Sequence, residues 1–329
     1  MPSKQVPIGS GNKATTTAEE AIGDADLRGK VAIVTGGYSG LGLETVRVLS
    51  NAGATLIVAG RDPDKARSRL AGLPRVEVRP LDLLDRASID AFATDILGTF
   101  TRVHILVNNA GFMGAPLKRD VRGYESHFSA NHLGHFQLTA RLWPALCRAD
   151  GARVISVSSR GHRMAPVEFS DMQFEHREYD RLIAYAQSKT AQALFSVGLD
   201  ARGEGLGIRA FSVHPGSIIT DLSRHFSDEE LRAYGISRNE PHRFPAGQSA
   251  GEGGDFKTVE QGAATQVWCA TSDQLRGMGG VYCENGDIAE VTSPEDVFRG
   301  GVCPWAVDPE LAERLWRISE ELSGASLGS

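Results

Sequence analysis

Short runs of β-branched and apolar residues alternate with longer helical patterns through most of this chain. The strands expected from these runs span residues 31–35, 55–59, 76–80, 105–108, 154–157, 208–214 and 280–283. The helical patterns between them span residues 41–52, 89–97, 124–142, 183–202 and 259–270. Strands that are apolar throughout and alternate with helices indicate a parallel sheet covered on both faces. The sequence therefore predicts an α/β, doubly wound fold, and we find no internal repeat of fixed period.

Composition excludes several classes of protein. The 329 residues are 41% hydrophobic and 23% charged, which is typical of a globular chain and argues against disorder and coiled coil. A net charge of −6 disfavours a nucleic-acid partner, because phosphate backbones attract basic surfaces. No apolar stretch approaches the roughly 20 residues needed to span a bilayer, and the first residues contain no apolar signal region. The scattered residues Cys147, Cys269, Cys283 and Cys303 predict neither disulfides nor a zinc cluster, so we expect a cytoplasmic protein with reduced thiols.

A glycine-rich turn follows the first expected strand. Residues 36–42 read Gly-Gly-Tyr-Ser-Gly-Leu-Gly and run directly into an amphipathic helical pattern. Glycines let the backbone approach a pyrophosphate, and the helix that follows offers free N–H groups and a positive dipole end. The spacing G-x-x-x-G-x-G differs from the general dinucleotide fingerprint, and glycine clusters also form plain turns. The position between strand and helix favours a phosphate-binding turn.

Four motifs in fixed order resemble the short-chain dehydrogenase/reductase superfamily. They are T-G-x-x-x-G-x-G at 35–42, N-N-A-G at 108–111, Y-x-x-x-K at 185–189 and P-G at 215–216. The segments N-H-L-G-H-F at 131–136, G-R-D at 60–62 and E-Q-G-A-A at 260–264 are similar to the retinol-dehydrogenase-like and WW-domain-oxidoreductase-like branch, which includes many bacterial oxidoreductases. The resemblance covers roughly residues 28–285. It implies a Rossmann-type, seven-stranded parallel sheet in the order 3-2-1-4-5-6-7.

The catalytic expectation centres on two residues four positions apart. Tyr185 and Lys189 lie on one face of an expected helix. A phenol has a pKa near ~10, so a neighbouring ammonium is expected to lower that pKa and make Tyr185 a usable general acid/base. The resemblance implies that Ser159 hydrogen-bonds the substrate carbonyl, that Lys189 also binds the nicotinamide ribose, and that Asn131 holds a water in a proton relay. Ser158 is expected to pack or to cap.

Three histidines lie near this expected site. His132, His135 and His162 could act as acids or metal ligands. We interpret the segment from Asn131 to His135 as packed helix, and we expect no metal because no acid-plus-histidine spacing supports one. The absence of G-x-S-x-G around the serine pair argues against a hydrolase elbow.

The resemblance also implies the residues that contact the cofactor. They are Gly36, Tyr38, Ser39, Gly40, Leu41, Gly42, Arg61, Lys65, Asp82, Leu83, Asn109, Ala110, Gly111, Tyr185, Lys189, Pro215, Gly216, Ile218 and Thr220. Relatives that select NAD usually place an acid after the second strand, where this chain has Gly60 followed by Arg61. Because Arg61 and Lys65 can hold a 2′-phosphate, NADP(H) is expected to be preferred, with NAD(H) also accepted. Alternatively, these charges are solvated residues at a helix start, and Asp62 lies close by.

One dinucleotide-binding catalytic domain is expected over residues 26–322. Residues 1–25 are expected to form a flexible tail with a short helix near 18–23, because Thr17 and Glu20 have capping-box spacing. A helix within 301–322 is expected to pack over the core, and 323–329 to form a second tail.

The polar segment 219–257 interrupts the strand–helix rhythm. Ser227 and Glu230 have capping-box spacing, and Gly235 is placed to end a short helix. An insertion with its own helix and aromatic residues favours a substrate lid, with a plain surface loop as the alternative.

The leading functional expectation is NADP(H)-dependent interconversion of a hydrophobic ketone or aldehyde and its alcohol, with Tyr185 as general acid/base. Phe112, Met113 and Ile218–Ile219 suggest the apolar pocket. The alternatives are a reductase or epimerase of another reaction type on the same scaffold, and a non-catalytic dinucleotide sensor. In many relatives the helices at 124–142 and 183–202 form a dimer interface, so a homodimer or homotetramer is compatible with the sequence.

Overall fold

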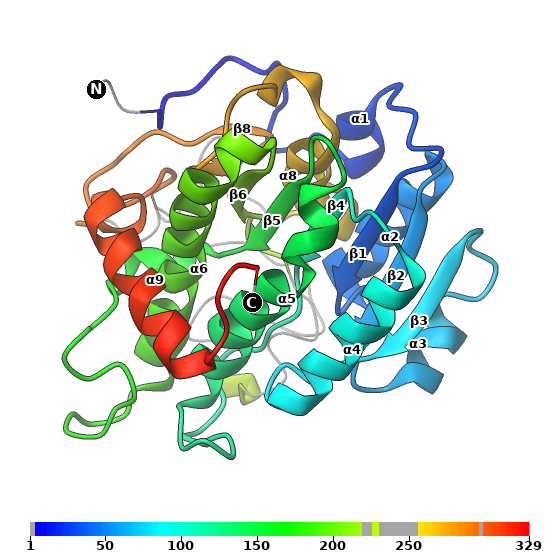
Figure 1. Cartoon of the computed structure of the whole chain (residues 1–329). Coiled ribbons are helices and arrows are strands. Elements are labelled where there is room, and N and C mark those ends of the chain that lie inside the picture. Colours follow the sequence, from blue (N-terminus) through cyan, green and yellow to red (C-terminus); the bar gives the residue numbers. More distant parts are fainter. Residues whose placement is uncertain (1–3, 219–225, 230–255, 296–298, 329) are drawn as a thin grey trace.

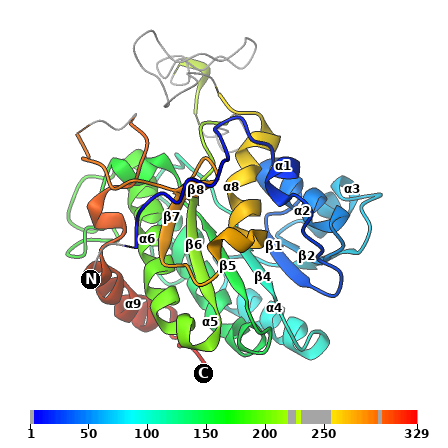
Figure 2. The ribbon, with the colours of Figure 1, turned by 90° about the horizontal axis from the view of Figure 1, so that it is seen from above.

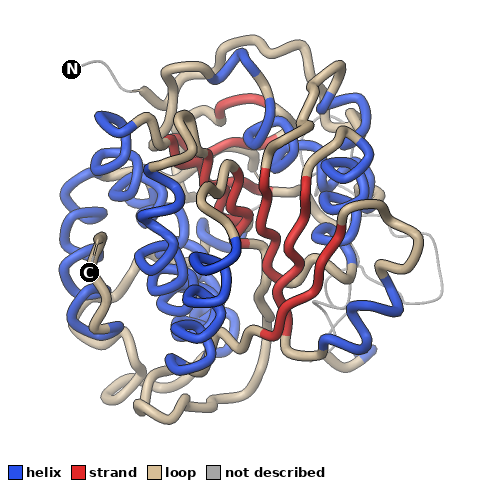
Figure 3. Tube along the Cα trace, turned by 45° about the vertical axis from the view of Figure 1, so that its right-hand side comes forward, coloured by secondary structure: helices blue, strands red, loops and turns tan. Residues whose placement is uncertain are grey.

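A twisted central sheet carries helices on both of its faces (Figure 1, Figure 3). The computed structural model describes residues 4–218, 226–229, 256–295 and 299–328. Helices α4, α5 and α6 lie on one face of the sheet, and α2 and α8 lie on the other (Figure 2). This is the doubly wound α/β architecture that the alternating pattern predicts.

The sheet contains seven parallel strands and a short antiparallel eighth. Its strands are β1 (Val31–Thr35), β2 (Thr55–Gly60), β3 (Val76–Pro80), β4 (Ile105–Asn108), β5 (Arg153–Val157), β6 (Arg209–His214), β7 (Val281–Glu284) and β8 (Asp287–Ile288). Their order is β3-β2-β1-β4-β5-β6-β7-β8, so the seven strands expected from the resemblance have the expected order. The count of seven misses β8, which pairs with β7 through a turn at Asn285 and Gly286. Both turn residues have positive φ, 53° and 69°, as a two-residue type I′ hairpin requires.

The apolar strands supply two hydrophobic cores, one on each face of the sheet. Ile33 of β1 packs into the core beneath α4 and α5, whereas its neighbours Ala32 and Val34 pack into the core beneath α2 and α8. Successive side chains of a strand point to opposite faces, so a strand buried on both faces must be apolar at every position.

Eight helices pack around the described part of the sheet. They are α1 (Ala18–Ile22), α2 (Gly40–Asn51), α3 (Pro63–Arg69), α4 (Arg86–Thr99), α5 (Gly134–Cys147), α6 (Arg181–Gly203), α8 (Val259–Thr271) and α9 (Pro309–Ser323). Within the described residues, no helix is both long enough and apolar enough to cross a membrane.

The helix expected over 124–142 begins later and irregularly. Residues Phe128–Leu133 form a π-helix, and α5 follows from Gly134. The Glu125 carboxylate accepts hydrogen bonds from the backbone N–H groups of His127 (2.9 Å) and Phe128 (2.8 Å). These bonds satisfy the first free N–H groups of the helical segment, so the helix starts after Glu125 rather than at Tyr124.

Helix α9 covers α6 on the outside of the molecule (Figure 1). The Trp316 ring is stacked on Phe195 at 5.9 Å between centroids and meets Phe136 edge-on at 4.9 Å. Arg202 of α6 lies over the Trp316 ring, 4.1 Å from its centroid, and donates to Glu313 at 2.7 Å. The C-terminal helix expected within 301–322 therefore forms, and its Trp316 packs against core residues of α5 and α6.

The segment before α1, expected as a flexible tail, is bound along the β7–β8 edge. The Gln5 amide is buried, donating to the carbonyls of Tyr282 and Ala289 at 2.7 Å each and accepting from the Tyr282 N–H at 2.8 Å. Helix α1 then begins at the capping box of Thr17 and Glu20, as expected. At the other end of the chain, Leu327 packs against the core in the stretch expected as a second tail.

Most of the expected lid lies outside the described residues, which include only 226–229 and 256–257 of the segment 219–257. Glu230 and Gly235, which belong to the helix expected there, also lie outside them.

Candidate functional site

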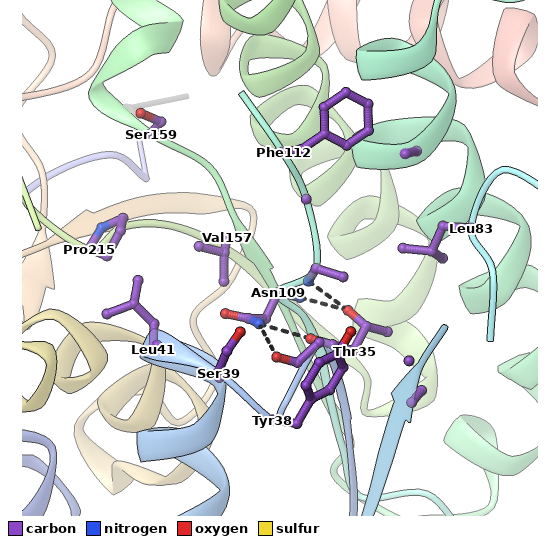
Figure 4. A pocket seen from close by; sticks show the side chains of 18 of the residues that line it. Thr35, Tyr38, Ser39, Leu41, Leu83, Asn109, Phe112, Val157, Ser159 and Pro215 are labelled. Atoms are coloured by element: carbon purple, nitrogen blue, oxygen red, sulfur yellow. Dashed lines mark hydrogen bonds between the residues drawn. The ribbon is translucent and has the colours of Figure 1, made fainter. Parts of the chain in front are cut away.

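A cavity of ≈ 270 Å³ opens at the carboxyl edge of the central strands (Figure 4). It is lined by Thr35, Gly36, Tyr38, Ser39, Gly40, Leu41, Gly42, Ala59, Gly60, Arg61, Leu81, Asp82, Leu83, Leu84, Asn109, Ala110, Gly111, Phe112, Ala130, Val157, Ser158, Ser159, Tyr185, Lys189, Pro215, Gly216 and Ile218. Open α/β sheets bind ligands at this edge, where the strand order reverses around the first strand.

The glycine turn after β1 forms one wall of the cavity. Gly36 has φ +65°, which favours glycine, and a Cβ at Gly42 would lie 2.6 Å from the Gly36 carbonyl oxygen. Ser39 stands before the first turn of α2, and within the described chain its side chain makes no capping hydrogen bond to that helix. The N–H groups and the positive dipole end of α2 therefore face the cavity from a tight turn that has no room for a side chain at Gly42. These features fit a dinucleotide pyrophosphate.

Hydrogen bonds join this turn to the segment after β4. The backbone N–H groups of Asn109 and Ala110 each donate to Thr35 Oγ1 at 2.9 Å. The Asn109 amide donates to the Thr35 carbonyl at 2.8 Å (Figure 4). The two cofactor motifs thus form one rigid unit centred on Thr35, a residue that we did not single out from the sequence.

Tyr185, Ser159 and Lys189 meet at the cavity from two elements. Helix α6 supplies Tyr185 and Lys189, both 4% exposed, and the end of β5 supplies Ser159. The Lys189 ammonium lies 5.5 Å from the centre of the Tyr185 ring. Ser159 Oγ accepts from the Gly161 N–H at 3.0 Å, and its hydroxyl also forms a hydrogen bond with Tyr185. Ser158, expected to pack or cap, donates to the Lys189 carbonyl at 2.8 Å and so ties β5 to α6.

Burial is the largest influence on the pKa values of Tyr185 and Lys189. It raises the pKa of Tyr185 to about 12, against a smaller lowering by the hydrogen bond with Ser159. Burial lowers the pKa of Lys189 to about 7. The lowered phenol pKa expected from the sequence is therefore wrong for this structure. The ammonium donates instead to the Val157 carbonyl at 2.8 Å and to Gln192 Oε1 at 2.7 Å.

Asn131 lies behind the cavity rather than in it. It is fully buried in the π-helix and is not among the described residues that line the cavity. Its amide binds the Phe112 backbone in both directions, at 3.2 Å each, and donates to Ser188 Oγ at 2.9 Å. Asn131 thereby joins the cavity wall to the residue that precedes Lys189.

Of the two cations expected to hold a 2′-phosphate, Arg61 and Lys65, only Arg61 borders the cavity. Arg61 is exposed and lines the cavity, whereas Lys65 is exposed on α3 and is not among the described lining residues. Asp62 caps α3 by accepting from the Lys65 N–H at 3.0 Å. A Cβ at Gly60 would collide with the Tyr38 ring, which occupies the space beside the turn.

The expected cofactor residues otherwise gather around this cavity. All of them line it apart from Lys65 and Thr220, and Thr220 lies outside the described residues. The sequence reasoning missed Thr35 and Gln192, which hold the cofactor segments and Lys189. Thr35 is the first letter of the glycine motif and was readable. Nothing in the sequence brings Gln192 to notice.

Comparisons with known proteins agree with this geometry. The family model described as short chain dehydrogenase matches residues 30–231. A probable oxidoreductase of Streptomyces lividans is 42% identical over 306 residues, which cover 91% of this chain and 99% of that protein. Human retinol dehydrogenase 12 is 37% identical over 307 residues, covering 92% of this chain and 88% of that protein.

Solved structures share the fold over most of its length. A crystal structure of an uncharacterised protein from Mycobacterium paratuberculosis is 30% identical with a TM-score of 0.71, covering 94% of this chain and 98% of that chain. The RhlG/NADP active-site complex of Pseudomonas aeruginosa is 25% identical with a TM-score of 0.61, covering 79% and 95%.

Proposed function

This chain belongs to the short-chain dehydrogenase/reductase superfamily, in its retinol-dehydrogenase-like branch, and from that premise we propose that it interconverts hydrophobic ketones or aldehydes and their alcohols with NADP(H). The superfamily and its relatives make it an oxidoreductase acting on alcohol and carbonyl groups. One observation carries the finer proposal: Ser159, Tyr185 and Lys189 border the same cavity as the glycine turn.

Tyr185 is the proposed general acid/base. When bound, the nicotinamide cofactor supplies the hydride that the carbonyl carbon accepts. A phenol with a pKa of about 12 is protonated at neutral pH, so its Oη can give a proton to the carbonyl oxygen during reduction. Ser159 Oγ donates a hydrogen bond to the same oxygen and polarises the carbonyl.

Lys189 and Asn131 support these two hydroxyls. Lys189 is proposed to hold the nicotinamide ribose and to stabilise the phenolate left after proton transfer, which requires its ammonium to leave the Val157 carbonyl. Asn131 holds the Gly111–Phe112 wall by its amide and is proposed to keep a water of the proton relay.

The cofactor preference rests on Arg61. Gly60 places no carboxylate beside the adenine ribose, and the exposed Arg61 guanidinium borders the cavity. A guanidinium binds a phosphate with two parallel hydrogen bonds, so NADP(H) is favoured over NAD(H). The NADP complex of RhlG supports this choice in a related fold.

The substrate is proposed to be apolar. Phe112 and Ile218 line the cavity, as Tyr185 does, and the relative at 37% identity is named a retinol dehydrogenase. The segment 219–257 is proposed as the lid over this side, since it directly follows Ile218. The four cysteines are free thiols, which supports the proposed cytoplasmic location.

A substrate panel tests the proposal. Oxidation of NADPH and of NADH is followed with a short ketone, a steroid ketone, retinal, an α,β-unsaturated ketone and a sugar nucleotide. We expect turnover of the bulky carbonyl compounds with NADPH, with the alcohol as product. Saturation of the carbon–carbon double bond would identify a reductase of another type, and isomer formation without net oxidation would identify an epimerase. Tight nucleotide binding without turnover of any compound would identify a sensor.

We also propose that the protein forms a homodimer or a homotetramer. A homodimer or homotetramer through α5 and α6 would have to use the surface of α6 that α9 leaves free. Light scattering coupled to gel filtration measures the mass directly.

A further inference from the structure

Four buried histidines, His127, His132, His135 and His162, lie near the site, and His135 contacts both the cofactor turn and the segment that carries Asn131. His135 is 1% exposed, at the second position of α5. Its Nδ1 lies 2.9 Å from the Asn131 carbonyl oxygen, and its Nε2 lies 2.9 Å from Thr35 Oγ1. The ring therefore bridges the end of β1 and the π-helix that carries Asn131.

The chemistry of the partners determines the proton positions. A carbonyl oxygen only accepts, so Nδ1 must carry the proton that it donates to Asn131. Burial lowers the pKa of His135 to about 4, so the ring is neutral at pH 7 and its Nε2 is a bare acceptor. The Thr35 hydroxyl then donates to Nε2, while its oxygen accepts from the Asn109 and Ala110 N–H groups. The result is one directed chain of hydrogen bonds.

This chain of hydrogen bonds leads through Asn131 to the residues that line the cavity. The Asn131 side chain binds the Phe112 backbone. A Cβ on the neighbouring Gly111 would lie 2.8 Å from Asn131 Oδ1 and 3.7 Å from Lys189 Nζ. A shift of the Asn131 backbone would therefore move the cavity wall beside Lys189.

We propose that His135 is a positioning residue, which couples the cofactor turn to Asn131 and so sets the distance between the cavity wall and the Tyr185–Lys189 pair. This inference rests on the proposed function in so far as turnover is its readout. The link to Asn131 is the critical one. The proton of Thr35 has a second acceptor, the Val107 carbonyl at 3.4 Å, so the cofactor turn survives loss of the ring better than Asn131 does.

Two amide substitutions separate the links. His135→Asn places an amide nitrogen near the position of Nδ1 and can still donate to Asn131. His135→Gln places its amide near Nε2 and can still accept from Thr35. His135→Leu retains the apolar volume and loses both links. We expect kcat to fall on the order of 10- to 100-fold in the Leu and Gln variants and to be largely restored in the Asn variant. Affinity for NADPH should change less than threefold.

His132 provides the matched control. It is equally buried one turn away, but its Nε2 is hydrogen-bonded with Ser319 Oγ of α9 at 2.7 Å. His132→Leu should lower the melting temperature as His135→Leu does and leave the kcat of the folded enzyme near that of the wild type. Equal losses of kcat in His132→Leu and His135→Leu would reduce His135 to a packing residue, and so would an Asn variant no better than the Gln variant.

Two NMR measurements test the inference without turnover. Long-range ¹H–¹⁵N spectra of the imidazole should show the Nδ1–H tautomer at pH 7; a protonated Nε2 would overturn the proposed chain. The amide resonance of Phe112, which donates to Asn131 Oδ1, should shift in the Leu and Gln variants and stay in place in the Asn variant. An unshifted Phe112 resonance in all three variants would also overturn it. If the wild type binds NADPH but reduces no carbonyl compound, the proposed function fails while these spectra still decide the role of His135.

Discussion

Arg61→Ala tests the cofactor choice most directly. The guanidinium is exposed, borders the cavity directly after β2 and has no carboxylate at the preceding position, Gly60. Asp62 is engaged at the start of α3, where it accepts from the Lys65 N–H. Removal of Arg61 therefore deletes the proposed ligand of the 2′-phosphate without freeing an acid that would repel that phosphate.

The magnitude follows from the exposure of Arg61. Hydrogen bonds to charged groups contribute about 1.5–3 kcal/mol, and exposure to solvent favours the lower end because salt screens the pair. Since about 1.4 kcal/mol corresponds to a factor of ten, the Kd for NADPH should rise roughly tenfold. The Kd for NADH, which lacks the 2′-phosphate, should stay within about twofold.

The assay is a fluorescence titration of both nucleotides at low and at physiological salt, without substrate. Arg67→Ala is the matched control, because it removes one positive charge from α3, the helix that begins two residues after Arg61, where Arg67 pairs with Asp64 at 2.7 Å. Lys65→Ala should lie between the control and Arg61→Ala. A wild type that prefers NADH, equal weakening of both nucleotides, or an Arg67→Ala variant as weak as Arg61→Ala would each refute the reasoning.

Three further outcomes are expected. Tyr185→Phe should keep the fold and the NADPH affinity but lose at least roughly 100-fold in kcat, since it removes the transferred proton; near-normal turnover in steady-state assays would exclude Tyr185 from proton transfer. The pKa values of His135 and His162 are lowered to about 4 by burial, so on acidification these rings become protonated in the unfolded chain at a higher pH than in the folded protein. The free energy of unfolding measured in urea should therefore fall from about pH 6.5 towards pH 4, and a flat profile would contradict this. Trp316→Ala should cost about 3–5 kcal/mol of unfolding free energy in urea, because it empties the contact of α9 with α6, whereas Arg317→Ala, whose side chain is 76% exposed, should cost less than about 0.5 kcal/mol. Equal stabilities of these two variants would show that α9 is not part of the cooperative core.

Much of the fold is readable in the sequence because its signals are local. A strand buried on both faces must be apolar at each position, and β1, β3 and β4 have the bounds that the pattern predicts. The turn at Gly36–Gly42 requires glycine where the backbone has positive φ or packs too closely for a side chain. The four-residue spacing of Tyr185 and Lys189 places both on one face of α6. Strand β8 was also readable, since Asn285-Gly286 is a hairpin signal, but it was overlooked.

Other features depend on contacts between distant segments. The Tyr185–Lys189 spacing predicts proximity but not ionisation, because burial in the folded protein raises the pKa of Tyr185 and lowers that of Lys189. Lys65 has the charge for a phosphate, yet the direction of α3 keeps it out of the described cavity lining.

The histidines show the same division most clearly. The sequence places His132 and His135 three residues apart in one helical segment, and both are expected to be packed. Only the folded chain brings Ser319 to one ring and Thr35 to the other, from segments 187 and 100 residues away. Local sequence determines which side chains can form hydrogen bonds, whereas the partners of a buried ring are decided by the packing of helices against the sheet.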